Sequence, residues 1–224
     1  MEPYGYSPFN DFNRFQNLDG IEAKIVEHLI NSQSKHADIF WKLLKYNDLY
    51  ALSQPSVSIA ERKELVNYDN GYGNTKRVFF QPFVDDAWQE QCSSIYIYVD
   101  SLYPINHLTS FVGIKVETVT HSKIAAVSGD GDRELNPDAN PNDSDSEGNI
   151  VVAFKNRATV LLKCILAELN GIYIDGVGYV SFNTKSDIKG KVEKSLFNGR
   201  NFYGHVTTFV MEISGVSGNS NVGF

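Results

Sequence analysis

Among the side chains that could do chemistry, the carboxylates are concentrated in one segment of this sequence. A cluster of this kind could bind a cation or catalyse hydrolysis. Seven carboxylates fall within residues 128–149: Asp130, Asp132, Glu134, Asp138, Asp143, Asp145 and Glu147. The segment has one base, Arg133, so seven acids less one base leave it a net −6 of the chain's −7. Because apolar side chains are scarce, the segment cannot offset its own ordering entropy. We expect a long exposed loop, without the preorganisation that catalysis needs.

Residues 143–148 of this segment resemble the first half of a calcium-binding loop. Asp143, Asp145 and Glu147 alternate with two serines and are followed by Gly148, as in such a loop. The twelfth position of a calcium loop carries a glutamate that binds the ion through both oxygens, and here it is Phe154. The pattern fails at its most selective position, so we predict no metal site. Weak cation binding by a loose acidic loop stays open.

The other candidates for chemistry lack the required spacing. Residues 176–181 begin like a dinucleotide fingerprint but have no third glycine and follow a helix, so we expect a turn. Cys92 and Cys164 lie in apolar runs, which predicts buried free thiols rather than a nucleophile. The five histidines show no ligand spacing: His28, His36, His107, His121 and His205. We predict no catalytic residue, no metal and no cofactor, and we do not expect an enzyme.

Composition favours contacts with other proteins. Fourteen Phe and twelve Tyr exceed what one core needs, and surplus aromatic residues are common at protein interfaces. Outside residues 128–149 the chain is nearly neutral, without a basic patch to neutralise phosphates. The start of the chain lacks a signal-peptide pattern, and no apolar run approaches membrane-spanning length. We expect a protein made in a cytoplasm, with no membrane partner and no specific binding of DNA.

Local patterns divide the chain into four parts. Residues 1–18 are aromatic, Asn-rich and interrupted by proline, which predicts an arm that drapes over the body or, in an assembly, reaches a neighbouring subunit. Residues 19–75 form a helical region, in which capping boxes at 19–22 and 58–61 open two of three helices. Residues 76–213 form an α+β core that includes the acidic loop 128–149. Residues 214–224 form a flexible tail.

The core combines strand patterns with one regular helix. Strands are expected at 77–84, 94–100, 111–119, 178–183 and 203–213, and a helix at about 154–169, ended by Asn170-Gly171. Tyr96 and Tyr98 alternate with aliphatic residues, so we expect the core to cover one side of that strand and a partner to cover the other. The predicted fold class is α+β: an antiparallel sheet of about four to five strands packed by one long helix, with an N-terminal helical region.

The order of elements in the C-terminal half carries a family resemblance. A helix led by arginine, Arg157-Ala-Thr-Val-Leu-Leu-Lys-Cys-Ile-Leu-Ala-Glu-Leu-Asn-Gly171, precedes a Gly-x-Gly turn with a short strand at 176–183 and a last strand that begins Phe202-Tyr-Gly204. Upstream, the strand 95–99, Pro104 and the strand 112–119 complete the pattern. This order resembles bacteriophage tail-terminator proteins over residues 76–213 without the loop. The helical residues 1–74 and the acidic insertion are more similar to neck proteins of larger or contractile tails.

The resemblance implies a hexameric ring that caps the tail tube and joins it to the head connector, with DNA passing through its lumen. The implied partners are other copies, the tail tube protein, a sheath in a contractile tail and head-side neck proteins, in a virion assembled in the host cytoplasm. The seven acids would line the lumen, where negative potential repels phosphates, or lie on a solvated outer loop.

Other functions stay open at this point. A second structural role is a head-completion, sheath-contacting or baseplate protein with a similar sheet. From other classes, a small hydrolase with an unrecognised site and a monomeric binding module are the alternatives. Size in solution or in a virion preparation separates them, because a ring protein assembles with other copies.

Overall fold

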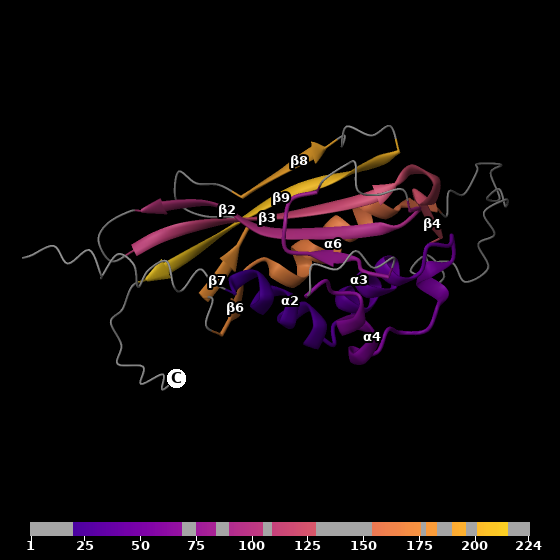
Figure 1. The fold of residues 1–224 in the computed structure, drawn as a ribbon, viewed down its shortest axis with the longest axis horizontal. Coiled ribbons are helices and arrows are strands. Elements are labelled where there is room, and N and C mark those ends of the chain that lie inside the picture. The colour runs from indigo at the N-terminus through magenta and orange to yellow at the C-terminus, as the bar shows by residue number, and fades with distance from the viewer. Residues whose placement is uncertain are drawn as a thin grey trace, which may run out of the picture.

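A curled sheet that wraps around short helices forms the body of the protein (Figure 1). The computed structural model describes residues 20–68, 75–83, 90–104, 109–128, 154–175, 178–182, 190–195 and 201–214. Within these ranges the main sheet has seven strands in the order β1-β2-β3-β9-β7-β6, and β8 also pairs with β9. We call the side of the sheet that contacts the helices its inner face and the other side its outer face.

Three long antiparallel strands make up the centre of the sheet: β2 (Ser93–Pro104), β3 (Thr109–His121) and β9 (Phe202–Ser214). Their side chains alternate between the two faces, as a pleated strand requires. Ile97 of β2 pairs with Val116 of β3, which pairs with Thr207 of β9, and all three are buried on the inner face. The strand patterns predicted at 94–100, 111–119 and 203–213 are confirmed, with each strand extending further than predicted.

Shorter strands complete the structure: β1 (Val78–Phe79), β4 (Ala126–Ser128), β5 (Phe154–Asn156), β6 (Ile172–Ile174), β7 (Gly178–Ser181) and β8 (Lys191–Ser195). β1 runs parallel to β2, whereas β6 and β7 form an antiparallel hairpin. β7 and β8 pair with different parts of the same edge of β9. β4 and β5 form a separate two-stranded sheet.

The predicted fold class is wrong. The expected sheet was antiparallel, had four to five strands and packed against one long helix, whereas the observed sheet is mixed and has seven strands. β6 and β8 were missed because strands of three to five residues are too short to show a clear period of two. The helix predicted at 154–169 begins at Arg157, since residues 154–156 form β5.

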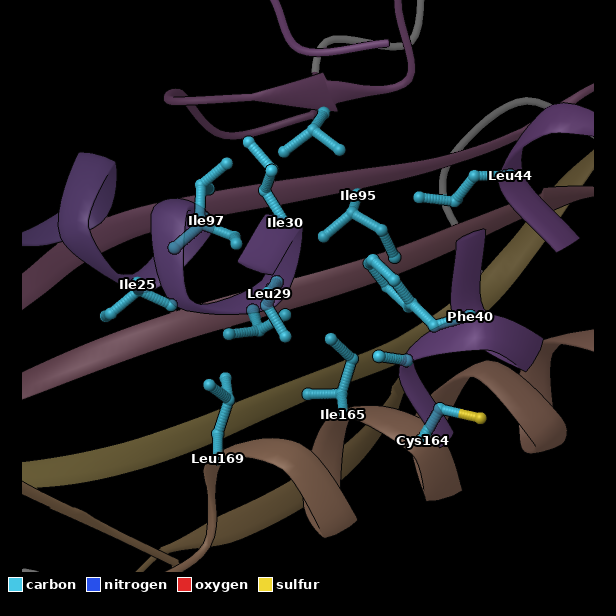
Figure 2. Close-up of a cluster of buried hydrophobic side chains, with 14 of the residues drawn as sticks. Ile25, Leu29, Ile30, Phe40, Leu44, Ile95, Ile97, Cys164, Ile165 and Leu169 are labelled. Carbon is cyan, nitrogen blue, oxygen red and sulfur yellow. The ribbon is translucent and has the colours of Figure 1, made fainter. Parts of the chain in front are cut away.

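The part of the chain that the structure describes has four short helices, three in the predicted N-terminal region and one where the long helix was expected: α2 (Ile21–Asn31), α3 (Lys35–Lys45), α4 (Ile59–Glu64) and α6 (Arg157–Leu169). Among the described residues, the 3-10 turn η1 (Ala51–Ser53) lies between α3 and α4, and η3 (Ser122–Ile124) lies between β3 and β4. Figure 2 shows Leu29 of α2, Phe40 of α3 and Ile165 of α6 packed together beneath Ile95 of β2. Residues 19–75 and 76–213 therefore contribute to one continuous hydrophobic core.

Two charged side chains of α6 hold the two ends of α3. The guanidinium of Arg157 is completely buried and donates to three carbonyl oxygens at the C-terminal end of α3, those of Leu43, Tyr46 and Asp48, over 2.6 to 3.0 Å. Glu168 accepts a hydrogen bond from the hydroxyl of Ser34, the N-cap of α3. A cation at the C-terminal end and an anion at the N-terminal end both complement the dipole of α3. The arginine quoted for the family resemblance therefore has a structural role in the core.

Two of the predicted helix ends are confirmed and one is wrong. Ser58 and Glu61 form a capping box at the start of α4, as predicted. Gly171, with a φ of +75°, ends α6 in the left-handed region that glycine tolerates best. The box predicted at 19–22 is wrong, because the N-cap of α2 is Gly20, which has a φ of +84° and no side-chain cap; Asp19 itself lies outside the described residues.

Candidate interaction surface

The seven acids predicted to form an interface or a lumen loop lie outside the described residues: Asp130, Asp132, Glu134, Asp138, Asp143, Asp145 and Glu147. The structure does describe both ends of this segment, because Ser128 of β4 pairs with Phe154 of β5. The backbone N–H of Ser128 also donates to the carbonyl oxygen of Leu49 at 2.8 Å. The acidic segment is therefore closed at its base by β4 and β5, which lie at the right-hand end of the sheet in Figure 1.

Metal and thiol chemistry find no support in the residues that the structure describes. No group of three or more His, Cys, Asp and Glu side chains within them is arranged to hold a metal ion. Cys92 and Cys164 are buried free thiols, as predicted. Burial raises the pKa of Cys164 to about 12 and also raises the pKa of Cys92, which keeps both thiols protonated. Among the described helices, none has the length and apolar character needed to cross a bilayer.

A shallow pocket of about 220 Å³ lies between α3, α4 and the start of β1. Its lining residues are Lys45, Glu61, Glu64, Leu65, Thr75 and Arg77. The Nζ of Lys45 lies 2.5 Å from the Oε1 of Glu61, and the Nη1 of Arg77 lies 3.6 Å from the Oε2 of Glu90. The hydrogen bond from Lys45, helped by those from Ser58, lowers the pKa of Glu61 to about 2. These charges pair with one another and do not converge on a position for a ligand.

The outer face of the sheet carries aromatic side chains at both ends, and at one end they are covered. There, Phe79, Tyr96, Val119 and Phe202 form a second small core, against which Phe83 packs. The ring centroids of Phe79 and Tyr96 stack at 5.0 Å, and Phe83 meets Tyr96 at 5.2 Å and Phe202 at 5.7 Å. We call these five residues the covered cluster. The cover that the sequence led us to expect from a partner is supplied at Tyr96 by the chain's own residues 79–83.

A buried carboxylate holds this covering segment on the sheet. Glu117 of β3 is 8% exposed; its Oε2 accepts the backbone N–H of Phe83 at 3.0 Å and its Oε1 accepts the hydroxyl of Tyr98 at 2.6 Å. Burial and the hydrogen bond to Glu117 both raise the pKa of Tyr98. The covering segment is thus fixed in two ways, by ring stacking and by a carboxylate that accepts from its backbone.

At the other end of the outer face, four aromatic side chains and one carboxylate form a row across five strands. Tyr103 of β2 pairs with Phe111 of β3, and Phe111 pairs with Glu212 of β9. On the far side, Tyr179 of β7 pairs with Tyr173 of β6, and the register of β7 on β9 places Tyr179 next to Glu212. We call these five residues the open row. With strands about 4.8 Å apart, it is about 19 Å long.

Three of the four rings of the open row are exposed, and Phe111 is half-buried. Tyr103, Tyr173 and Tyr179 are 45%, 61% and 66% exposed, although Tyr173 and Tyr179 meet edge to face with centroids 5.2 Å apart. Contiguous exposed apolar surface marks interaction sites, and tyrosine is enriched in the residues that dominate binding energy. Sequence reasoning missed this row. The alternation in Ile172–Ile174 indicates that Tyr173 points outward. The strand register that aligns the four rings, however, cannot be predicted from the sequence of any one strand.

The described edges of the sheet are closed to simple extension by another strand. On β2, the Oε1 of Glu22 accepts the backbone N–H of Val99 at 3.1 Å, the register shifts between Val99 and Ser101, and the strand ends at Pro104. β8 carries an ion pair between Lys191 and Glu193, and β6 has three residues. Bulges, proline, charges and short strands are the devices that prevent edge-to-edge pairing. A neighbouring chain would therefore meet the described body on its face.

No family model, no curated protein and no solved structure matches this chain.

Proposed function

We propose that the protein is a structural assembly subunit, which acts through its contacts with other chains. The observation that carries the proposal is the open row, an aromatic surface about 19 Å long on a sheet whose opposite end is covered. The charged groups that the structure describes are paired or dispersed, and this favours a binding role over a hydrolase.

Within this class, we propose a tail-terminator or neck ring subunit of a long-tailed bacteriophage. Support comes from the order of elements that resembles these proteins, now seen as α6, β7 and β9. Two residues of that pattern have defined structural roles. Arg157 joins α6 to α3, and a side chain at Gly204 of β9 would overlap the carbonyl oxygen of Thr118. In this role the subunit would cap the tail tube, contact the head-side connector and let DNA pass through the ring.

The proposal also gives the two ends of the sheet different roles. Phe111 of the open row lies ten residues before His121, the last residue of β3, so the row is about 33 Å from the end of β3 that leads to the base of the acidic segment. The open row would serve contacts between proteins. The acids between 130 and 147 would face either the DNA path, where they repel phosphates, or the solvent. Deletion of residues 130–147 distinguishes these positions, because unaltered assembly and infectivity would leave only the solvated loop.

Native mass spectrometry of the purified chain tests the proposal, together with antibody labelling of phage particles from cells in which the gene is expressed. We expect a ring, or a monomer that assembles on tail tubes, with label at the junction of head and tail. A chain that stays monomeric with and without tubes, and that is missing from the particles, would overturn it.

A further inference from the structure

We propose that the open row is the docking site for residues 1–18 of a second copy of this chain. This inference rests on the proposed ring and names the contact that would hold neighbouring subunits together. It joins the rings of one copy, the exposed Tyr103, Tyr179 and Tyr173 and the half-buried Phe111, to the aromatic arm of the next.

The covered cluster shows what kind of segment fits this face. At that end, Phe79 of β1 stacks beside Tyr96 of the neighbouring β2, Phe83 meets Tyr96 at an angle from the segment that follows β1, and Glu117 accepts the backbone N–H of Phe83. The open row offers the same elements without an occupant in the described structure: rings on neighbouring strands and one carboxylate, Glu212, between them. The matching occupant is an extended segment rich in phenylalanine and tyrosine.

Residues 1–18 have the composition that this site requires. They contain five aromatic residues at close spacing: Tyr4, Tyr6, Phe9, Phe12 and Phe15. They also contain a single base, Arg14, which lies between Phe12 and Phe15. The open row has one charged member, the exposed Glu212. An arginine flanked by phenylalanines therefore complements a carboxylate flanked by Phe111 and Tyr179, and charge-assisted pairing would set the register of the arm.

The position and length of the arm allow this contact. α2, which follows the arm, contacts both β2 and β6, the two outermost strands of the open row. The arm therefore leaves the body close to this end of the sheet. Eighteen extended residues span up to about 60 Å, roughly three times the length of the row.

Docking on a second copy, and not on the same chain, follows from the edges of the sheet. A ring needs a contact between copies, and the described edges of β2, β6 and β8 are closed by a side-chain cap, by shortness and by charge. An exchanged arm provides the contact without an open edge. In addition, α2 lies on the inner face, so an arm docking on its own row would first have to pass around the edge of the sheet.

Two defective variants test the inference when they are mixed. Deletion of residues 1–18 removes the arm and keeps the row, whereas Tyr173→Thr with Tyr179→Thr removes the two rings at the β6 end of the row and keeps the arm. Sedimentation velocity over a concentration series should show that each variant alone dissociates at least about tenfold more readily than the wild type. Mixed together, they should form a heterodimer that does not grow into a ring, since only one arm–row contact remains. Tyr50→Thr, at a tyrosine that is 58% exposed and outside the row, is the matched control and should assemble like the wild type.

A charge exchange tests the register. Arg14→Glu and Glu212→Arg should each weaken assembly, and the two together should restore it, whereas Glu193→Arg on β8 should have no effect.

Assembly of the arm-deleted chain at wild-type affinity, or no heterodimer in the mixture, would overturn this inference and leave the ring proposal standing. A wild type that forms no oligomer alone or on tail tubes would overturn the proposed function itself. Urea unfolding of each variant shows whether a loss of assembly reflects loss of fold.

Discussion

The two ends of the outer face carry similar side chains and differ in what lies over them. At the covered cluster, Phe79 stacks beside Tyr96 from the neighbouring strand, Phe83 packs against Tyr96, and Glu117 accepts the backbone N–H of Phe83. At the open row, Tyr173 and Tyr179 contact only one another among the ring contacts described, and both stay more than 60% exposed. The comparison teaches that aromatic content alone does not show whether a surface belongs to the core or to an interface. The position of the covering segment decides it.

Gly204→Ala should have the largest effect on this comparison. Gly204 pairs with Val119 of the covered cluster, and a Cβ there would overlap the carbonyl oxygen of Thr118, which is backbone and cannot rotate away. We expect the free energy of unfolding to fall by at least about 3 kcal/mol in urea denaturation. Gly113→Ala, next to the open row, is the matched control. Its Cβ would meet only the movable hydroxyl of Ser101, so the loss should stay below about 1 kcal/mol. Equal losses at both glycines would contradict tighter backbone packing at the covered end.

Removal of one ring from each end should separate the two surfaces next most clearly. Phe83→Ala takes away contacts with Tyr96 and Phe202, and we expect a loss of about 2 kcal/mol in the free energy of unfolding. Tyr179→Thr keeps a residue that favours strands and removes an exposed ring, so the change should be within about 0.5 kcal/mol. Both values come from urea denaturation of dilute protein. A large loss from Tyr179→Thr would show that the open row stabilises the monomer.

Loss of the carboxylate should lower the free energy of unfolding more at Glu117, beside the covered cluster, than at Glu212 of the open row. The effect should be smaller than that of removing a ring. Glu117→Gln leaves one acceptor oxygen for two donors, the Phe83 N–H and the Tyr98 hydroxyl, and we expect a loss of about 1–2 kcal/mol. Glu212→Gln should leave the free energy of unfolding within about 0.5 kcal/mol of the wild type. Thermal denaturation at neutral pH measures both. The pKa of Tyr98 should also fall in Glu117→Gln, because a cause of its increase is removed.

The smallest effect concerns stability at high pH. Burial raises the pKa of Tyr96, and burial together with Glu117 raises the pKa of Tyr98. A phenol with a raised pKa in the folded state stabilises the fold below its unfolded pKa of about 10, and this contribution is lost as the pH rises further. The free energy of unfolding should therefore decrease above about pH 10. Tyr96→Phe with Tyr98→Phe should make the decrease shallower; an unchanged slope would show that these two phenols are not its source.

The elements with local signals were predictable, and those that depend on distant contacts were not. The capping box of Ser58 and Glu61 and the three long strands follow from spacings of a few residues. β1 was expected only as an edge strand. Its two residues and its parallel pairing with β2 have no local signature, so the mixed sheet was missed. The acidic segment was found from composition, but the open row requires the register of β2, β3, β9, β7 and β6 together.

Charged residues of α6 illustrate the same limit. Arg157 at its N-terminal end and Glu168 near its C-terminal end both have the wrong sign for the dipole of their own helix. The arrangement makes sense only beside α3, whose ends these side chains bind with the right sign. Arg62 of α4 acts in a similar way on α2, donating to the carbonyl oxygens of Ile30 and Ser32.

The amino-acid sequence by itself determined the helices, the long strands and the buried thiols, because period, capping and apolar runs are properties of neighbouring residues. Only the tertiary structure decided that the sheet is mixed, that Arg157 and Glu168 belong to α3, and that one aromatic surface is covered while the other is exposed. The physical reason is that burial depends on which distant segments meet, and strand register sets that over the whole sheet.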